Sequence, residues 1–315
     1  MIRVFRLVNI MKLVGLLFFL HGWIALASQS NQGVGSWKSY LPYKYGWSVT
    51  QSPEAVYFGT QWALMKINKS DLSIEYFSKV DGLNDIEIAT VAYSDDEKVL
   101  VVVYRNSNID LVFKDRIVNL DQIKSNTQIA GDRSVYHVFL LPPYAYLSTG
   151  FGLVQLNIQD REFGSTTFTN FRINKVTSFG GYLFMATTAG IYRIPSDGSV
   201  NIADFSLWER LDIEWGLPLN YQAGLIITFD NNLYASIEES LYLLDGLSFV
   251  KLHEEAGYRV AYMTPINDKI LIGWQCLSGC NDKKMLLDPQ GLIEDLFISC
   301  ANKTLDAVAD ERGRI

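Results

Sequence analysis

The sequence is poor in the residues from which catalytic and metal sites are usually built. Its 315 residues include only 3 histidines and 3 cysteines. It contains no Gly-x-Ser-x-Gly turn, no His-Glu-x-x-His pair, no phosphate-binding loop and no EF-hand spacing. These absences argue against the common hydrolase, metalloprotease and nucleotide-binding classes. We therefore expect no catalytic residues, no metal and no cofactor, and a protein that is not an enzyme.

Positive charge is scarce as well. The 27 Lys and Arg residues are outnumbered by 34 Asp and Glu residues, which gives a formal net charge of −7. No basic block is present that could neutralise phosphates, so nucleic acid is not an expected partner. His137 lies in the apolar segment Ser134–Phe139, and its simplest interpretation is an imidazole on the face of a strand.

Long apolar runs are confined to the N-terminus. Basic residues precede the stretch 13–27, which ends in the small-residue pattern Ala25-Leu26-Ala27. A membrane helix needs roughly 20 apolar residues, so this shorter stretch predicts a cleaved secretory signal peptide over 1–27 and no transmembrane span. The residue directly after the cleavage site is not a cysteine, which argues against a lipoprotein. We expect export of residues 28–315 to the periplasm, the outer membrane or the cell surface.

A short phrase recurs along the rest of the chain. It consists of an aromatic residue, an apolar residue, a small residue, Thr, a short polar tip and an alternating apolar run. Successive copies are offset by 44, 45, 38, 50 and 37 residues, which is close to the period of β-propeller blades. The copies start at Tyr57, Val101, Tyr146, Phe184, Tyr234 and Leu271.

Each phrase predicts a β-hairpin, because apolar residues alternate on both sides of a turn. The small residues Gly59, Ser148 and Ala186 suit the place where the inner strands of neighbouring blades converge. Turn residues between the phrases predict four strands per unit. The six complete units are expected over 46–78, 88–120, 134–169, 174–211, 223–253 and 257–297.

A further unit is expected to begin at Thr304 and to stop after one strand. The segment Ser36–Leu41, which precedes the first unit, would pair beside this strand and close the ring. The sequence thus predicts an all-β, seven-bladed β-propeller with six complete four-stranded blades and a truncated seventh.

One side of such a propeller would carry most of the exposed aromatic residues. In a four-stranded antiparallel blade, the tip between the second and third strands and the connection to the next blade lie on the same side. Aromatic rings with polar groups suit the recognition of protein or sugar surfaces, although the same rings could simply cover blade interfaces. The candidate binding residues are Tyr43, Tyr45, Trp47, Trp62, Phe151 and Trp215.

The three cysteines lie near one another in the last complete unit. Cys276 and Cys280 flank a three-residue hairpin tip, a separation suited to a disulfide, and export favours oxidation. Cys300 is expected either to be a free thiol or to compete for disulfide formation with one of the other two cysteines. A zinc site is a weaker alternative, because no fourth ligand is evident.

These patterns resemble a known type of propeller repeat. The two-component-regulator repeat combines an Asp-x-x-Gly-x-Ile turn with an aromatic residue, a small residue, Thr and then Gly-Leu or Gly-Ile. Here Asp310–Ile315, Ser148–Thr149 and Gly190–Ile191 carry that pattern. More closely, three ordered phrases resemble the PorZ family of the type IX (Por) secretion system: Trp37–Tyr43, Ser78–Asp85 and Asn106–Leu111.

The PorZ resemblance implies a non-enzymatic component of a cell-surface secretion and attachment complex. It implies binding to a sortase partner and to an anionic lipopolysaccharide or glycan. Members of that family carry a second propeller and a C-terminal signal domain, so residues 28–315 correspond to the N-terminal propeller alone. Two alternatives remain: the periplasmic, oligosaccharide-sensing propeller of a hybrid two-component system, and a propeller enzyme such as a polysaccharide lyase.

Overall fold

The structure is a computed structural model that describes residues 41, 43, 46–297 and 305–309. The chain divides into two compact units, Met1–Tyr40 and Leu41–Ile315, and the described residues all belong to the second. The predicted signal peptide lies outside the described residues, as does the predicted strand Ser36–Leu41 except for its last residue. No helix among the described residues is both long enough and apolar enough to cross a membrane.

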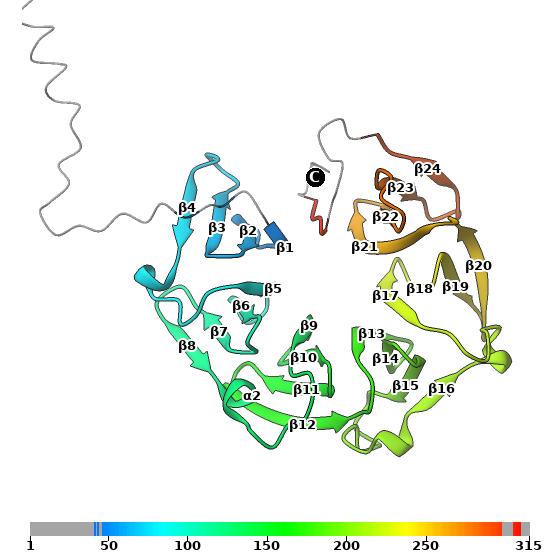
Figure 1. Ribbon diagram of the computed structural model, residues 1–315, viewed down its shortest axis with the longest axis horizontal. Helices are drawn as coiled ribbons and strands as arrows, with labels where there is room; N and C mark the ends of the chain where they lie inside the picture. Colours follow the sequence, from blue (N-terminus) through cyan, green and yellow to red (C-terminus); the bar gives the residue numbers. More distant parts are fainter. Residues whose placement is uncertain (1–40, 42, 44–45, 298–304, 310–315) are drawn as a thin grey trace, which may run out of the picture. The chain divides into compact units, whose positions relative to one another are not determined.

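The described residues form six four-stranded antiparallel sheets, which are arranged as blades around a common axis (Figure 1). Within each blade the strands follow chain order from the inside outward. The first three blades contain β1 (Gly46–Gln51), β2 (Ala55–Thr60), β3 (Leu64–Asn68), β4 (Ile74–Phe77), β5 (Ile88–Ser94), β6 (Val99–Tyr104), β7 (Ile109–Val112), β8 (Ile117–Leu120), β9 (Val135–Leu141), β10 (Tyr144–Thr149), β11 (Gly152–Asn157) and β12 (Glu162–Phe168).

The other three blades repeat this arrangement, and the predicted limits of all six units agree with the observed strands to within two residues. Short helical turns occur in the connections between blades and, in the fourth blade, between its third and fourth strands. The strands are β13 (Ile173–Phe179), β14 (Tyr182–Thr187), β15 (Gly190–Pro195), β16 (Glu209–Leu211), β17 (Ala223–Phe229), β18 (Asn232–Ile237), β19 (Ser240–Asp245), β20 (Ser248–Glu254), β21 (Tyr258–Ile266), β22 (Lys269–Cys276), β23 (Lys283–Leu287) and β24 (Ile293–Asp295), and the turns are η1 (Lys79–Asp81), α2 (Gln122–Ser125), η2 (Phe205–Leu207) and η3 (Ile213–Trp215).

The prediction of a seventh blade is wrong. Residues 305–309 form no strand and lie between the first and last blades. Their contacts to β1 and β21 run through side chains: the carboxylate of Asp306 accepts a hydrogen bond from the amide of Val49 at 3.0 Å, and the Thr264 hydroxyl donates to the carbonyl of Ala307 at 2.8 Å. A strand needs a neighbour that pairs with its backbone, and no such neighbour exists among the described residues.

The threonine of the repeated phrase closes the hairpin tip. In three blades its hydroxyl donates to the carbonyl of the residue three positions later, at 2.6 to 2.7 Å, and accepts amide hydrogen bonds from the tip. These threonines are fully buried. The phrase recurs because a buried turn needs partners for its backbone groups, and a threonine hydroxyl supplies both a donor and an acceptor. The residues are Thr60, Thr149 and Thr187.

Each inner strand also carries a β-bulge near its start. The extra residue shifts the register against the second strand at the same place in all six blades. Small residues opposite the bulge leave room for the neighbouring blade, as predicted: a Cβ on Gly59 would lie 2.8 Å from Cγ2 of Ile88 in the second blade. A Cβ on Gly273 would overlap the ring of Tyr262.

The hydrophobic core is divided among the interfaces between successive blades. One cluster of buried side chains lies between each pair, from the Leu64 and Leu100 cluster of the first two blades to the Tyr234 and Trp274 cluster of the last two. A smaller cluster around Leu271 packs against Ala307 and Ala309. Residues 305–309 therefore cover apolar surface on the last blade without adding a sheet.

Candidate binding site

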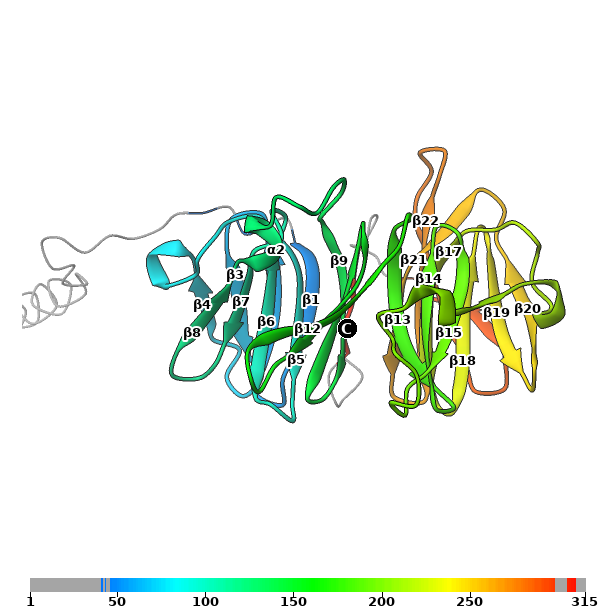
Figure 2. The same ribbon diagram turned by 90° about the horizontal axis from the view of Figure 1, so that it is seen from below.

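The hairpin tips between second and third strands and the connections between blades lie on one side of the propeller, which we call the interblade face. Figure 2 shows α2 and the tip between β22 and β23 together on this upper side. The arrangement follows from four antiparallel strands per blade. Five of the six candidate aromatic residues are described, and the structure gives them different environments.

Two of the candidate tryptophans belong to the first blade. Trp47 is the bulge residue of β1, half-buried, with the guanidinium of Arg105 4.8 Å from its ring centroid. Its Nε1 atom is buried and has no hydrogen-bond partner within the described part of the chain. Trp62 lies at the tip between β2 and β3 and is also half-buried. A cation over an indole ring favours a fixed, partly exposed aromatic surface here.

Tyr43 and Trp215 have intramolecular partners. The ring of Tyr43 lies 4.0 Å from the ring of Tyr76 on β4, and Tyr45 lies outside the described residues. Arg193 covers the Trp215 ring at 4.1 Å, and the indole Nε1 of Trp215 donates to Glu209 at 3.2 Å. Trp215 also packs against the core between the fourth and fifth blades. For Trp215 the alternative interpretation, that the ring covers a blade interface, describes the structure better.

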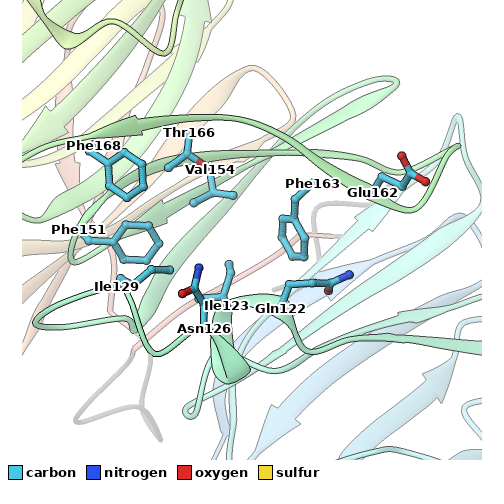
Figure 3. Close-up of a pocket in the computed structure, with 10 residues that line it drawn as sticks. All are labelled: Gln122, Ile123, Asn126, Ile129, Phe151, Val154, Glu162, Phe163, Thr166 and Phe168. Atoms are coloured by element: carbon cyan, nitrogen blue, oxygen red, sulfur yellow. The ribbon is translucent and has the colours of Figure 1, made fainter.

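Phe151 is only 6% exposed and forms part of the core between the second and third blades. It also forms one wall of a pocket with a volume of about 440 Å³, which we call the α2 pocket (Figure 3). The other apolar walls come from the connection that contains α2 and from the outer strands of the third blade. The lining residues are Gln122, Ile123, Asn126, Ile129, Phe151, Val154, Glu162, Phe163, Thr166 and Phe168.

The pocket has an apolar interior and a polar rim. Arg133 fixes the α2 connection, because its Nη1 donates to the carbonyls of Lys124 at 3.0 Å and Asn126 at 2.9 Å. Phe168 is 61% exposed, and its ring lies 5.9 Å from that of Phe151. Apolar walls with a few polar groups at the edge are typical of ligand and anchor-residue pockets.

Phe151 was named from the sequence as a candidate binding residue, but neither this pocket nor the residues around it were predicted. Phe163 and Phe168 lie on an outer strand, where alternation alone does not show which side faces a neighbouring loop. Ile123 and Ile129 lie between the second and third predicted units, in a connection for which nothing was predicted. The available signal was a cluster of two isoleucines in a long polar connection.

The structure also brings two family-like phrases together. Asn84 and Asp85, at the end of one phrase, bond to residues of the hairpin phrase Asn106–Leu111. The carboxylate of Asp110 is fully buried and accepts hydrogen bonds from the backbone and side-chain amides of Asn84, each at 2.9 Å. Asp85 accepts from Asn106 at 2.5 Å and pairs with Lys124 at 2.7 Å. This network fastens the connection between the first two blades to the second blade.

The charge on Asp85 is stabilised by this network. Partial burial acts to raise the pKa of Asp85, but hydrogen bonds from Lys124 and Asn106 outweigh it and lower the pKa to about 2. In Tyr104, burial and the hydrogen bond to Asp110 raise the pKa of the phenol. Both shifts favour the protonation states found at neutral pH.

We predict that protonation of Asp85 lowers the stability of the protein in acid. Because its pKa is lower in the folded than in the unfolded chain, its contribution is present above about pH 4 and is lost as the pH falls toward about 2. This contribution to the free energy of unfolding is about 2 kcal/mol, because the Asp85 side chain is only 13% exposed. Urea unfolding of the native chain and of Asp85→Asn should differ by this amount at pH 7 and converge near pH 2. An equal difference at both pH values would contradict the prediction.

The cysteine pair lies at the tip between β22 and β23. Cys276 and Cys280 form a disulfide with a Cα–Cα distance of 5.5 Å, and Cys300 lies outside the described residues. The described residues contain no group of three or more His, Cys, Asp or Glu side chains placed to hold a metal ion.

Comparisons with known proteins extend this description. Residues 56–209 match the family model of the PorZ N-terminal β-propeller domain of the type IX secretion system. The structure resembles PorZ of Porphyromonas gingivalis, described as an essential bacterial surface component of that system, with a TM-score of 0.73 and 19% identity. The match covers 87% of this chain and 35% of PorZ, so the chain spans about a third of the length of that protein.

Other solved propellers share the fold at lower similarity. The WD40 repeats of RRP9 match with a TM-score of 0.59 and 11% identity, covering 88% of this chain and 87% of theirs. A chain of the Mitotic Checkpoint Complex matches with a TM-score of 0.59 and 10% identity, covering 89% of this chain and 94% of its own. No curated protein sequence matches this chain. The resemblance seen in the sequence is confirmed by the match over residues 56–209: the chain carries a β-propeller of the PorZ N-terminal type.

Proposed function

We propose that this propeller is a non-enzymatic binding component of a type IX secretion and attachment complex at the bacterial surface. The family match over residues 56–209 is the observation that carries the proposal. The partners proposed are a sortase-like protein and an anionic lipopolysaccharide or glycan. Export of the chain to the periplasm or outer surface is part of the same proposal.

The α2 pocket is the proposed contact site for the protein partner. It offers apolar walls, a rim of amide and carboxylate groups, and an exposed aromatic ring in Phe168. A partner side chain that enters such a pocket is removed from water, and this is the geometry of interface residues that dominate affinity. Trp47 and Trp62 on the first blade are proposed as a second aromatic contact on the interblade face.

We predict that Phe168→Ala weakens binding to the purified sortase partner about thirtyfold, equal to about 2 kcal/mol. The fold should be retained, because most of this ring is exposed. Biolayer interferometry on immobilised sortase, and separately on purified anionic lipopolysaccharide, measures the affinities, with thermal melting as the test of folding.

Phe297→Ala is the matched control, since Phe297 is an exposed phenylalanine that follows β24, far along the chain from the pocket. The Phe297→Ala variant should bind the sortase partner with the same affinity as the native chain. An unchanged affinity for both Phe168→Ala and Trp62→Ala would show that the partner uses another surface. Failure of the native chain to bind either ligand would overturn the proposed function itself.

A further inference from the structure

The residue that follows the bulge occupies an equivalent place in all six inner strands. It pairs in register with the second strand one step after the register shift, near the interblade end of the blade. The inner strands surround the axis (Figure 1), so these six positions form a ring about it. They are occupied by Ser48, Thr90, His137, Lys175, Leu225 and Tyr262.

Two of these positions carry groups that can bear a positive charge, and they are neighbours. His137 is on β9 in the third blade and Lys175 is on β13 in the fourth. Ser148 on β10 is the cross-strand partner of His137, so both side chains lie on the same face of their sheet. The third and fourth blades therefore place an imidazole, a hydroxyl and an ammonium group close together near the axis.

The polar atoms of this group lack partners. Nδ1 of His137 and Oγ of Ser148 are buried and make no hydrogen bond to any residue that the structure describes. Among the described residues, Lys175 has no hydrogen bond and no carboxylate within 4 Å of its ammonium group. Buried polar groups normally have a partner, because an unmade hydrogen bond costs the group its hydration without compensation.

The electrostatic surroundings fit a missing anion. Burial lowers the pKa of Lys175, and burial together with the nearby charge of Lys175 lowers the pKa of His137. The only acidic group of the described residues that acts on Lys175 is Asp306. Its Oδ2 accepts from the amide of Val49 and its Oδ1 from the amide of Ala307, both at 3.0 Å. The charge of Asp306 therefore acts on Lys175 against the effect of burial, but the two side chains form no ion pair.

We propose that His137, Ser148 and Lys175 form an axial binding site for one oxyanion, of the carboxylate or phosphate class. A lysine ammonium group, a hydroxyl and an imidazole N–H on two neighbouring blades supply several donors, and an oxyanion supplies several acceptors. Bound anion would satisfy the orphaned atoms and stabilise the charged form of Lys175. The site goes beyond the proposed partner binding and does not depend on it.

The histidines allow a direct test. The chain has only 3 histidines, and His253 already bonds to Glu255 at 3.2 Å, so it serves as an internal reference. Imidazole ¹H–¹⁵N spectra are recorded while inorganic phosphate, acetate or chloride is added at constant ionic strength. The resonances of His137 should move with phosphate or acetate and stay in place with chloride, whereas those of His253 should not respond. Movement with phosphate alone, or with acetate alone, identifies which oxyanion the site accepts.

Two lysine variants make the test specific. Lys175→Met keeps the length of the side chain and removes a buried charge, so it should fold; the response of His137 to phosphate and acetate should disappear. Lys66→Met is the matched control, because Lys66 lies on β3 and pairs with Glu75 at 3.2 Å; the response should remain. His137 resonances that ignore both oxyanions in the native chain, or that shift equally in Lys175→Met, would overturn the proposal.

Discussion

Replacing Phe184 by alanine should lower the free energy of unfolding by about 3–5 kcal/mol. Phe184 is 2% exposed and belongs to the core between the fourth and fifth blades, next to the rings of Phe179 and Tyr182. Removing it leaves a cavity that two stiff sheets can only partly fill. Urea unfolding followed by circular dichroism measures the change.

Phe168→Ala is the control for this measurement, since it removes the same side chain from an exposed position. It should change the free energy of unfolding by about 0.5 kcal/mol or less. A similar loss in both variants would show that the interblade clusters are not the source of stability. A loss below about 1 kcal/mol for Phe184→Ala would contradict the packing seen around it.

The blades themselves could be predicted because each carries its own local signal. A hairpin needs alternating apolar residues and a turn, and both are visible in one continuous segment such as Tyr57–Ile67. The threonines at the tips were recognised as part of the phrase, although their reason, a hydroxyl that satisfies a buried turn, became clear only from the hydrogen bonds.

The number of blades could not be predicted in the same way. The segment near Ala307 has the apolar residues of an inner strand, but a strand depends on the backbone of a neighbour, and sequence pattern does not show whether that neighbour is present. In the structure this segment bonds to Val49, Gln51 and Thr264 through side chains instead. The strand near Ala307 was predicted from its apolar residues, whereas its formation depends on backbone pairing with a neighbouring strand.

The candidate site was predicted less well than the fold. Topology places interblade connections on one side, but it does not determine whether a ring there is free or covered. Trp215 is covered by Arg193, and Phe151 is covered by its own blade interface. The α2 pocket combines residues of the connection that contains α2 with residues of the third blade, so no single segment of sequence carries its pattern.

Replacing Asp110 by alanine should cost about 3 kcal/mol or more, because the carboxylate is fully buried and its donors would lose their acceptor. These donors are the two amides of Asn84, the Asn119 side chain at 2.8 Å and the Tyr104 hydroxyl at 2.5 Å. Their backbone and side-chain positions are fixed by the second blade, so they have no room to turn toward water. The free energy of unfolding in urea measures the loss.

Two further variants separate the network from the general effect of removing a charge. Asp115→Ala removes a carboxylate that is 74% exposed and should change stability by about 0.5 kcal/mol or less. Tyr104→Phe removes one donor and should cost about 1 kcal/mol. Combined with Asp110→Ala it should add less than that, because the hydroxyl then has no partner left to lose. Fully additive losses would show that Tyr104 and Asp110 contribute to stability independently, and not as parts of one hydrogen-bond network.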